Sequence, residues 1–362
     1  MSRLITVTDG TKPIYDIAIE QDFSLLVEKF NELGFKNRKI AIISDSNVAP
    51  LYAEAVKTEL SKTGNQVFFY SFDAGEKNKN LDTVQDVYEY LVLNHFDRHD
   101  CLAALGGGVV GDLTGFAAAT YMRGIDFIQI PTSLLAMTDS SVGGKTGVDF
   151  RAYKNMVGAF HQPRLVYMNM SVLKSLDDRQ FNCGLGEILK HGVIRRPDYF
   201  EWLLANVEGI HNQDPETMEH MIEESCNVKR IVVENDQKEH GERAVLNFGH
   251  TLGHAIEKLS GFSLFHGECV VLGMIAALKI SMERGYISTS EYEKSREVFA
   301  SFGFPMTVNN MTAEEIVATT KNDKKMDAGK INFVLVKPFG HAYVDSSVTD
   351  EEMMDAVKEV LA

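Results

Sequence analysis

The sequence predicts an α/β domain built on a parallel-type sheet, followed by a mostly α-helical domain. In the first half of the chain, short apolar segments alternate with amphipathic helical ones, which is typical of parallel sheets with helices on both faces. After about residue 176 the apolar spacing is almost entirely helical. A length of 362 residues also favours two domains. We therefore expect domains at residues 1–176 and 177–362.

Strands and helices alternate in the predicted first domain. The expected strands are 39–44, 66–72, 101–105 and 127–130, and the expected helices are 51–62 and 83–93. Parallel sheets bind ligands beyond the carboxyl ends of their strands. The loops after Ser44, Phe72, Leu105 and Ile130 are therefore the expected ligand-binding loops.

Helical spacing dominates the second half. The expected helices are 187–194, 200–207, 216–234, 250–259, 268–284, 290–301 and 351–361, and the one late strand is 331–336. This part of the chain has no internal repeat and no Pro- or Ser-rich linker. A cleft between the two domains is the expected place for a substrate.

Composition and charge exclude several classes of protein. Hydrophobic residues make up 44% and charged residues 24%, which is typical of folded chains. The 36 Lys and Arg against 51 Asp and Glu give a net charge of −15, which argues against nucleic acid or an anionic membrane as a partner. An anionic ligand must then be bound by a local cluster of cations.

The cysteines and the N-terminus indicate a reducing compartment. The four cysteines form no CxxC pair and no disulfide framework. The N-terminus lacks the apolar core of a signal peptide, and the longest apolar stretch, 269–278, is about half a membrane span. We expect a soluble, cytoplasmic protein.

A glycine motif follows the predicted strand 101–105. Gly106, Gly108 and Gly111 fit GxGxxG and open a helix, where backbone N–H groups can bind a pyrophosphate. A plain tight turn is the alternative. An acidic ribose partner is usual about 20 residues later, but Asp126 precedes its strand and so lies at the wrong end. Asp45 is the better candidate, and the chain is not an ordinary Rossmann dehydrogenase.

The segment from Asp139 to Thr146 ends like a P-loop. The pattern GxxxxGK[ST] requires glycine where Asp139 stands, so an ATPase is disfavoured. Lys145 still provides a compact positive charge that suits a phosphate. A solvated surface loop is the alternative.

Histidines and one glutamate suggest a metal site. His250 and His254 lie at i and i+4 on one helical face, and His266 follows. With Glu187 they offer the donors of a catalytic zinc site. No glutamate follows His250, so this is not an HExxH protease. Spacing alone leaves open which two histidines bind the metal, and a structural role is the alternative.

Several cations lie in loop-like segments. They are Arg123, Lys145, Lys154, Lys190, Lys229, Arg243, Lys324 and Lys325. Each by itself is more often a solvated side chain. If they converge in a cleft, they predict a substrate with two or more negative charges.

Together these segments resemble the 3-dehydroquinate synthase family of sugar-phosphate cyclases. The matching stretches keep the family's order and spacing from about residue 40 to 340. They are residues 105–115, 131–146, 154–156, 186–190, 243–250, 266–268 and 323–325. The resemblance implies an NAD-binding α/β domain, a helical domain and one divalent metal, zinc or alternatively cobalt.

The resemblance also implies roles for individual residues. The metal ligands are Glu187, His250 and His266. The catalytic residues are Lys145, Asp139, Lys190, Glu239, Arg243, Asn247 and His254, and further substrate contacts are Arg123, Lys154, Asn155, Lys229 and Lys325. The NAD contacts are Asp45, Asn47, Gly75, Glu76, Lys77, Gly108, Val109, Val110, Gly111, Asp112, Thr132, Ser133, Lys145, Lys154, Val172, Leu173, Lys174 and Ser175.

The implied activity is that of a carbon–oxygen lyase in the shikimate pathway to aromatic amino acids. It would convert the anionic sugar phosphate 3-deoxy-D-arabino-heptulosonate 7-phosphate into 3-dehydroquinate and phosphate. The implied steps are transient oxidation by NAD, phosphate elimination, re-reduction and intramolecular aldol closure. The resemblance further suggests a homodimer. Alternatives are another sugar-phosphate cyclase, a metal-dependent polyol dehydrogenase or a non-catalytic NAD-binding protein.

Overall fold

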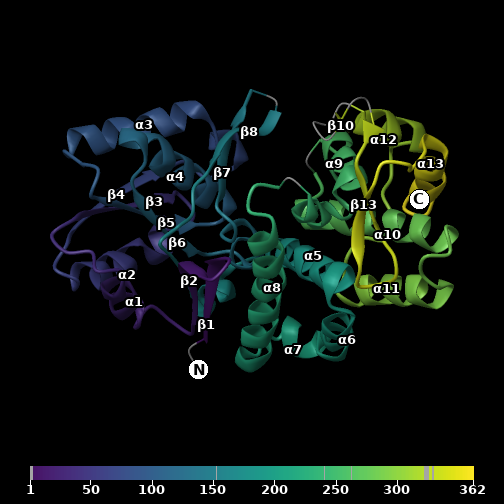
Figure 1. The fold of residues 1–362 in the computed structure, drawn as a ribbon, viewed down its shortest axis with the longest axis horizontal. Coiled ribbons are helices and arrows are strands. Elements are labelled where there is room, and N and C mark those ends of the chain that lie inside the picture. The colour runs from purple at the N-terminus through teal and green to yellow at the C-terminus, as the bar shows by residue number, and fades with distance from the viewer. Residues whose placement is uncertain (1–2, 152, 240, 262, 322–325, 328–329) are drawn as a thin grey trace. The chain divides into compact units, whose positions relative to one another are not determined.

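The chain forms two compact units. The computed structural model describes residues 3–362 except 152, 240, 262, 322–325 and 328–329. The units are Met1–Leu176 and Asp177–Ala362 (Figure 1). The predicted α/β sheet lies in the first unit and the predicted helices lie in the second, so the fold class read from the sequence is confirmed.

A seven-stranded sheet organises the described part of the first unit, in the order β1-β2-β9-β6-β5-β3-β4. Its strands are β1 (Arg3–Asp9), β2 (Lys12–Glu20), β3 (Lys39–Asp45), β4 (Gln66–Phe72), β5 (Cys101–Gly106), β6 (Asp126–Pro131) and β9 (Leu165–Asn169). All neighbours pair in parallel except β1 with β2. The carboxyl ends of β4, β3, β5, β6 and β9 therefore meet at one edge.

Helices cover both faces of this sheet (Figure 1). Alternate residues of β3 point to opposite faces, so Ala41 and Ile43 pack with α3 and α4, and Ile40 and Ile42 pack with α1 and α2. The helices are α1 (Leu26–Glu32), α2 (Ala49–Ser61), α3 (Leu81–Leu93) and α4 (Gly108–Thr120), with short helical turns η1 (Glu76–Asn78), η2 (Tyr121–Arg123), η3 (Ala136–Ser140) and η4 (Met170–Ser175). The hairpin β7 (Lys145–Phe150) and β8 (Tyr153–Phe160) packs on α4.

The second unit is a helical assembly with short strand pairs. Its helices are α5 (Asp178–Arg195), α6 (Pro197–Ala205), α7 (Val207–His211), α8 (Pro215–Asn235), α9 (His250–Leu259), α10 (His266–Glu283), α11 (Thr289–Ser301), α12 (Ala313–Thr320) and α13 (Asp350–Lys358), with the turn η5 (Glu242–Asn247). Its strands are β10 (Met326–Asp327), β11 (Lys330–Ile331), β12 (Phe333–Val336) and β13 (Ala342–Asp345). No helix among the described residues is both long and apolar enough to span a bilayer.

Helix α5 begins well before the expected residue 187. Gly184 and Gly186 weaken the local helical propensity, so the periodic pattern is clear only after them. The Asp177 carboxylate accepts a hydrogen bond of 2.9 Å from the Gln180 N–H and caps the earlier start. The capping box of Thr312 and Glu315 is the sequence signal that would have revealed α12, which was also missed.

Candidate functional site

Most of the predicted NAD contacts follow the parallel strands that end at one edge of the first sheet. Residues 45 and 47 follow or end β3, residues 75–77 follow β4, residues 108–112 follow β5, residues 132–133 follow β6, and residues 172–175 follow β9. These are the expected ligand-binding loops, together with one after β9 that the strand pattern missed. Because parallel strands share one carboxyl edge, residues far apart in the sequence are brought together here.

Packing explains part of the glycine motif. A Cβ on Gly106 would lie 2.5 Å from Val110, and one on Gly111 would lie 2.6 Å from Gln129 Oε1. These two glycines therefore let α4 pack tightly against the sheet. Gly108 begins α4, so the unpaired N–H groups of that helix lie at the ligand-binding edge.

Lys79 was not predicted, and it connects three of these segments. Lys79 is 4% exposed, and its ammonium donates to Asp112 Oδ2 at 2.6 Å and to Asn155 Oδ1 at 2.7 Å. Its carbonyl accepts from the Asp149 N–H at 2.8 Å. Burial works to lower the pKa of Lys79, but the carboxylates of Asp112, Glu76 and Asp149 together outweigh it and the net shift is upward. A single sequence carries no signal that distinguishes buried Lys79 from exposed Lys77.

Lys79→Met should lower the free energy of unfolding by about 3 kcal/mol, because it leaves the Asp112 carboxylate without its cation. Chemical denaturation of the purified variant measures this. Lys77→Met is the matched control, since Lys77 is exposed two residues away, and it should change stability by no more than about 0.5 kcal/mol. Equal losses in the two variants would contradict the structural role of Lys79.

Other predicted residues of the first unit have local roles of their own. Asp45 is 8% exposed, and its Oδ1 accepts from the N–H groups of Asn47 and Val48, both at 2.9 Å. Asp139 lies in η3, and the exposed Lys145 is the first residue of β7. The segment from Asp139 to Thr146 therefore leads into a strand and not into a helix, so it is not a P-loop, as expected. Lys154, like Asn155, is exposed on β8.

Arg123 lies apart from the predicted NAD contacts within the first unit. It ends η2, after α4 has returned the chain to the amino edge of the sheet, where β6 begins beside Cys101. Within this unit Arg123 and the predicted NAD contacts therefore lie at opposite edges of the sheet, and the role of Arg123 as a substrate contact stays a prediction. Asp126 lies at the same amino edge and accepts from Arg38 Nη1 at 2.7 Å, in agreement with its exclusion as a ribose partner.

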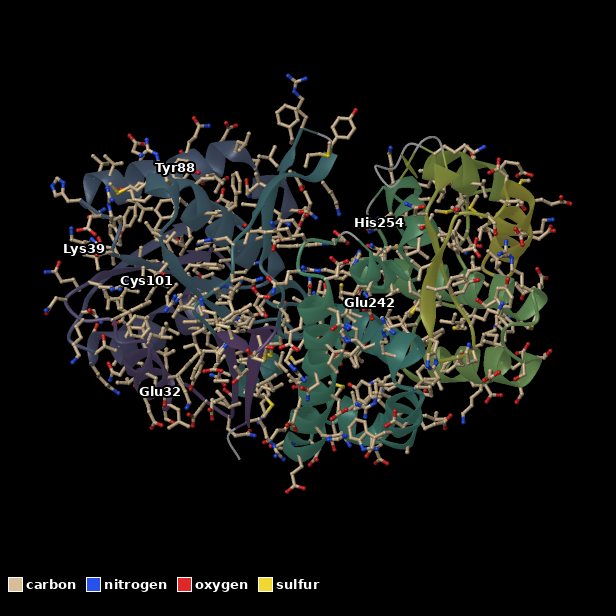
Figure 2. All side chains as sticks on the ribbon, viewed as in Figure 1. Glu32, Lys39, Tyr88, Cys101, Glu242 and His254 are labelled. Carbon is tan, nitrogen blue, oxygen red and sulfur yellow. The ribbon has the colours of Figure 1, made fainter. Side chains whose placement is uncertain are left out.

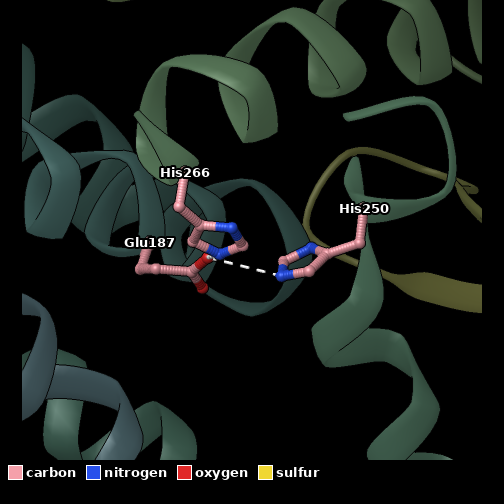
Figure 3. Close-up of side chains that lie close together, drawn as sticks. All are labelled: Glu187, His250 and His266. Atoms are coloured by element: carbon pink, nitrogen blue, oxygen red, sulfur yellow. Dashed lines mark ion pairs between the residues drawn. The ribbon is translucent and has the colours of Figure 1, made fainter. Parts of the chain in front are cut away.

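Glu187, His250 and His266 meet in the second unit (Figure 3). Glu187 comes from α5, His250 is the first residue of α9, and His266 is the first residue of α10. Glu187 Oε1 lies 3.5 Å from His250 Nε2 and 3.4 Å from His266 Nε2. One donor atom from each residue lies within 4.8 Å of the others.

The geometry of this group fits a divalent metal ion. The Glu187 side chain is 1% exposed, and its buried Oε1 has no hydrogen-bond partner among the described residues. Zinc bonds of about 2.0–2.1 Å at a tetrahedral angle of about 109° place two donors about 3.3–3.4 Å apart. The spacing of these donors is therefore close to the edge of a zinc coordination tetrahedron.

Neighbouring charges control the protonation of the group. Lys190 Nζ contacts Glu187 Oε2 within the same helix. Burial works to raise the pKa of the Glu187 carboxyl, but the charge of Lys190 and the contacts with His266 hold that pKa below its usual range. Burial works to lower the pKa of His266, but Glu187 and Glu257 raise it to about 9. Without a metal His266 is thus a cation at neutral pH, and metal binding must displace a proton.

Glycines set the close approach of the three helices that carry these ligands. A Cβ on Gly267 would lie 2.4 Å from the Cys183 carbonyl, where α10 crosses α5. A Cβ on Gly273 would lie 1.9 Å from the Gly249 carbonyl, where α10 meets the start of α9. Backbone contact at these two points fixes the separation of the three side chains.

Gly273→Ala should destabilise the chain by about 3 kcal/mol, the upper part of the range for overpacking, because backbone atoms must move to admit the methyl group. It should also weaken zinc binding. Chemical denaturation and zinc titration measure the two effects. Gly107→Ala is the control, because the backbone there is extended and a Cβ would meet Ser133 Oγ at an ordinary contact distance of 3.4 Å. A Gly273 variant as stable as this control would contradict the packing argument.

Further predicted site residues lie in the second unit. Lys190, Lys229 and Arg243 are 1%, 5% and 2% exposed, which is rare for cations. Asn247 Nδ2 donates to Glu239 Oε1 at 3.4 Å. The His254 ring lies 5.1 Å from that of His250 and 5.8 Å from that of His266, centroid to centroid. The predicted residues Lys324 and Lys325 lie outside the described residues.

Comparisons with known proteins identify the family. The sequence model of the 3-dehydroquinate synthase N-terminal domain matches residues 69–183, and that of the C-terminal domain matches residues 184–326. A protein of Acetivibrio thermocellus described as 3-dehydroquinate synthase is 42% identical over 358 residues, which cover 99% of this chain and 98% of the relative. The chain belongs to the 3-dehydroquinate synthase family. The resemblance inferred from the sequence motifs is thereby confirmed.

Solved structures with a similar fold extend the comparison. The 2-epi-5-epi-valiolone synthase of Streptomyces hygroscopicus, with NAD+ and Zn2+ bound, is 26% identical with a TM-score of 0.87, covering 95% of this chain and 96% of its own. A 2-deoxy-scyllo-inosose synthase in complex with carbaglucose-6-phosphate, NAD+ and Co2+ is 24% identical with a TM-score of 0.89, and both chains are covered completely. The second similarity shows the fold alone.

Proposed function

We propose that this chain is a 3-dehydroquinate synthase. It converts 3-deoxy-D-arabino-heptulosonate 7-phosphate into 3-dehydroquinate and phosphate, as a carbon–oxygen lyase of aromatic amino acid biosynthesis. The observation that carries the proposal is the buried group of Glu187, His250 and His266 beside Lys190, in a chain 42% identical to a protein of that name.

Each unit binds one of the two cofactors in this proposal. NAD+ binds at the carboxyl edge of the first sheet, and one divalent metal, zinc or cobalt, binds to Glu187, His250 and His266. The donor spacing in that group and the sister enzyme solved with NAD+ and Zn2+ support this assignment. When bound, NAD+ takes and returns a hydride, while the metal lowers the pKa of the substrate hydroxyl to be oxidised.

Buried cations of the second unit bind the substrate anions. The guanidinium of Arg243 presents the planar fork that matches a carboxylate or phosphate, while Lys190 and Lys229 add compact charges. Their burial in a chain with a net charge of −15 supports a substrate that carries both a carboxylate and a phosphate. Arg123 of the first unit remains a proposed substrate contact.

Groups close to the metal ligands carry out proton transfer in this proposal. His254 lies on the same face of α9 as His250, one turn later, and can exchange a proton with substrate atoms near the ligands. Glu239 accepts from Asn247 and supplies a further carboxylate beside η5. Lys145 and Asp139 act between substrate and cofactor, and Lys154, Asn155 and Lys325 remain proposed substrate contacts.

Release of inorganic phosphate from the heptulosonate phosphate tests the proposal. The zinc-loaded protein with NAD+ should release one phosphate per turnover without net accumulation of NADH. A polyol dehydrogenase would accumulate NADH and release no phosphate. A sister cyclase would instead release phosphate from another sugar phosphate such as glucose 6-phosphate. Removal of zinc with a chelator should stop the reaction, and added zinc should restore it.

The homodimer remains a proposal that rests on the family resemblance, and the cytoplasmic location remains one that rests on the cysteines and the N-terminus. Light scattering of the purified chain should give twice the mass of one chain. A monomer that retains full activity would contradict the proposed assembly.

A further inference from the structure

Two candidate metal groups share His266. The first is Glu187, His250 and His266, and the second is His254, Glu257 and His266. The two groups use different nitrogens of the shared ring. His266 Nε2 lies 3.4 Å from Glu187 Oε1, and His266 Nδ1 lies 3.4 Å from Glu257 Oε2. Figure 3 shows one ring nitrogen of His266 turned toward Glu187 and the other turned away from it.

A neutral imidazole cannot serve both groups at once. One ring nitrogen carries the lone pair that binds a metal, and the other carries a hydrogen that must be donated. If a metal binds Nε2, then the Nδ1–H points to the Glu257 carboxylate. If a metal binds Nδ1, then Glu257 is itself a ligand and Glu187 is not.

The surroundings favour a metal on Nε2. The Nδ1 of His250 lies 3.1 Å from the Phe248 carbonyl, which can only accept, so this histidine also presents its Nε2. Both Nε2 atoms lie at nearly equal distances, 3.5 and 3.4 Å, from the same Glu187 oxygen. In the first group, three donors from three helices thus face one point. In the second group, Glu257 and His254 both come from α9.

We propose that Glu257 is a positioning residue that accepts the Nδ1–H of His266 and holds its ring for the metal. The inference rests on the proposed metal role of Glu187, His250 and His266. The Glu257 side chain is 9% exposed and lies on α9, so the helix that begins with one ligand also orients the other. A backbone carbonyl orients His250 and a carboxylate orients His266, which is the usual outer support of metal-binding histidines. The second group then binds no metal of its own.

Metal content and affinity of purified variants test this inference independently of catalysis. The wild-type chain should bind one zinc ion, and Glu257→Ala should weaken zinc binding about 10–100-fold, as measured by chelator competition. Glu257→Gln keeps an oxygen that can accept the Nδ1–H, so it should recover most of the affinity. Glu283→Gln is the control on α10, because its side chain is 44% exposed, and it should bind zinc like the wild type.

Three outcomes would overturn the inference: two zinc ions per chain, Glu257→Ala with wild-type affinity, or Glu257→Gln as weak as Glu257→Ala. The free energy of unfolding of each metal-free variant shows whether a loss of affinity merely reflects a less stable fold. A chain that shows the expected zinc affinities but releases no phosphate would refute the proposed function and leave the role of Glu257 standing.

Discussion

His250→Ala should remove both the bound metal and the phosphate-releasing activity, whereas His254→Ala should keep the metal. His250 Nε2 lies 3.5 Å from Glu187 Oε1 and is oriented by the Phe248 carbonyl, so its loss deletes a metal ligand. Zinc sites with four ligands bind with about 10–16 kcal/mol, or about 3 kcal/mol for each ligand. We therefore expect zinc affinity to fall about 10²–10³-fold in His250→Ala.

The two variants form a matched pair, since both replace one imidazole on the same face of α9. Elemental analysis after dialysis against a chelator buffer measures the metal, and phosphate release measures turnover. His254→Ala should retain one zinc ion while its turnover falls about 10²–10⁴-fold, the usual contribution of a general acid or base. If His254→Ala loses its zinc and His250→Ala keeps it, the ligand set must be reassigned to His254, Glu257 and His266.

Lys145→Ala should reduce turnover far more than it weakens NAD+ binding. A compact ammonium that stabilises a departing phosphate acts mainly in the transition state, where loss of one such group lowers turnover about 10²–10³-fold. Lys145 is exposed at the start of β7, and exposed charges contribute at most about 1 kcal/mol to ground-state binding. The dissociation constant of NAD+ should therefore rise by less than about fivefold.

Single-turnover phosphate release and equilibrium titration with NAD+ separate these two effects. Lys62→Ala is the control, because this exposed lysine pairs only locally with Glu59 at the end of α2. It should leave both quantities unchanged. Losses of similar size in turnover and in NAD+ affinity would mean that Lys145 serves the cofactor and not the phosphate.

Local patterns in the sequence were enough for the fold class and for most of the elements. The strand 66–72 and the helix 250–259 begin and end where predicted, because their apolar periodicity depends only on neighbouring residues. The elements missed in the first unit, such as β1, β2 and β9, are defined by their pairing partners. Leu165–Asn169, for example, becomes a strand by lying between β2 and β6. Such pairing joins distant parts of the chain and leaves a weak local signal.

The sequence by itself determined the chemistry available to this protein: a glycine-rich turn after a strand, three histidines, one glutamate and a set of cations. The tertiary structure decided which of them meet. It brings Glu187 to His250 and His266 and turns Glu257 toward the other side of the His266 ring. It also buries Lys79 and places Arg123 at the far edge of its sheet. His254 lies in the second unit, as Figure 2 shows. Spacing along a chain fixes only which residues share a face of one element. The distance between side chains on different elements depends on how closely their backbones pack, as at Gly267 and Gly273.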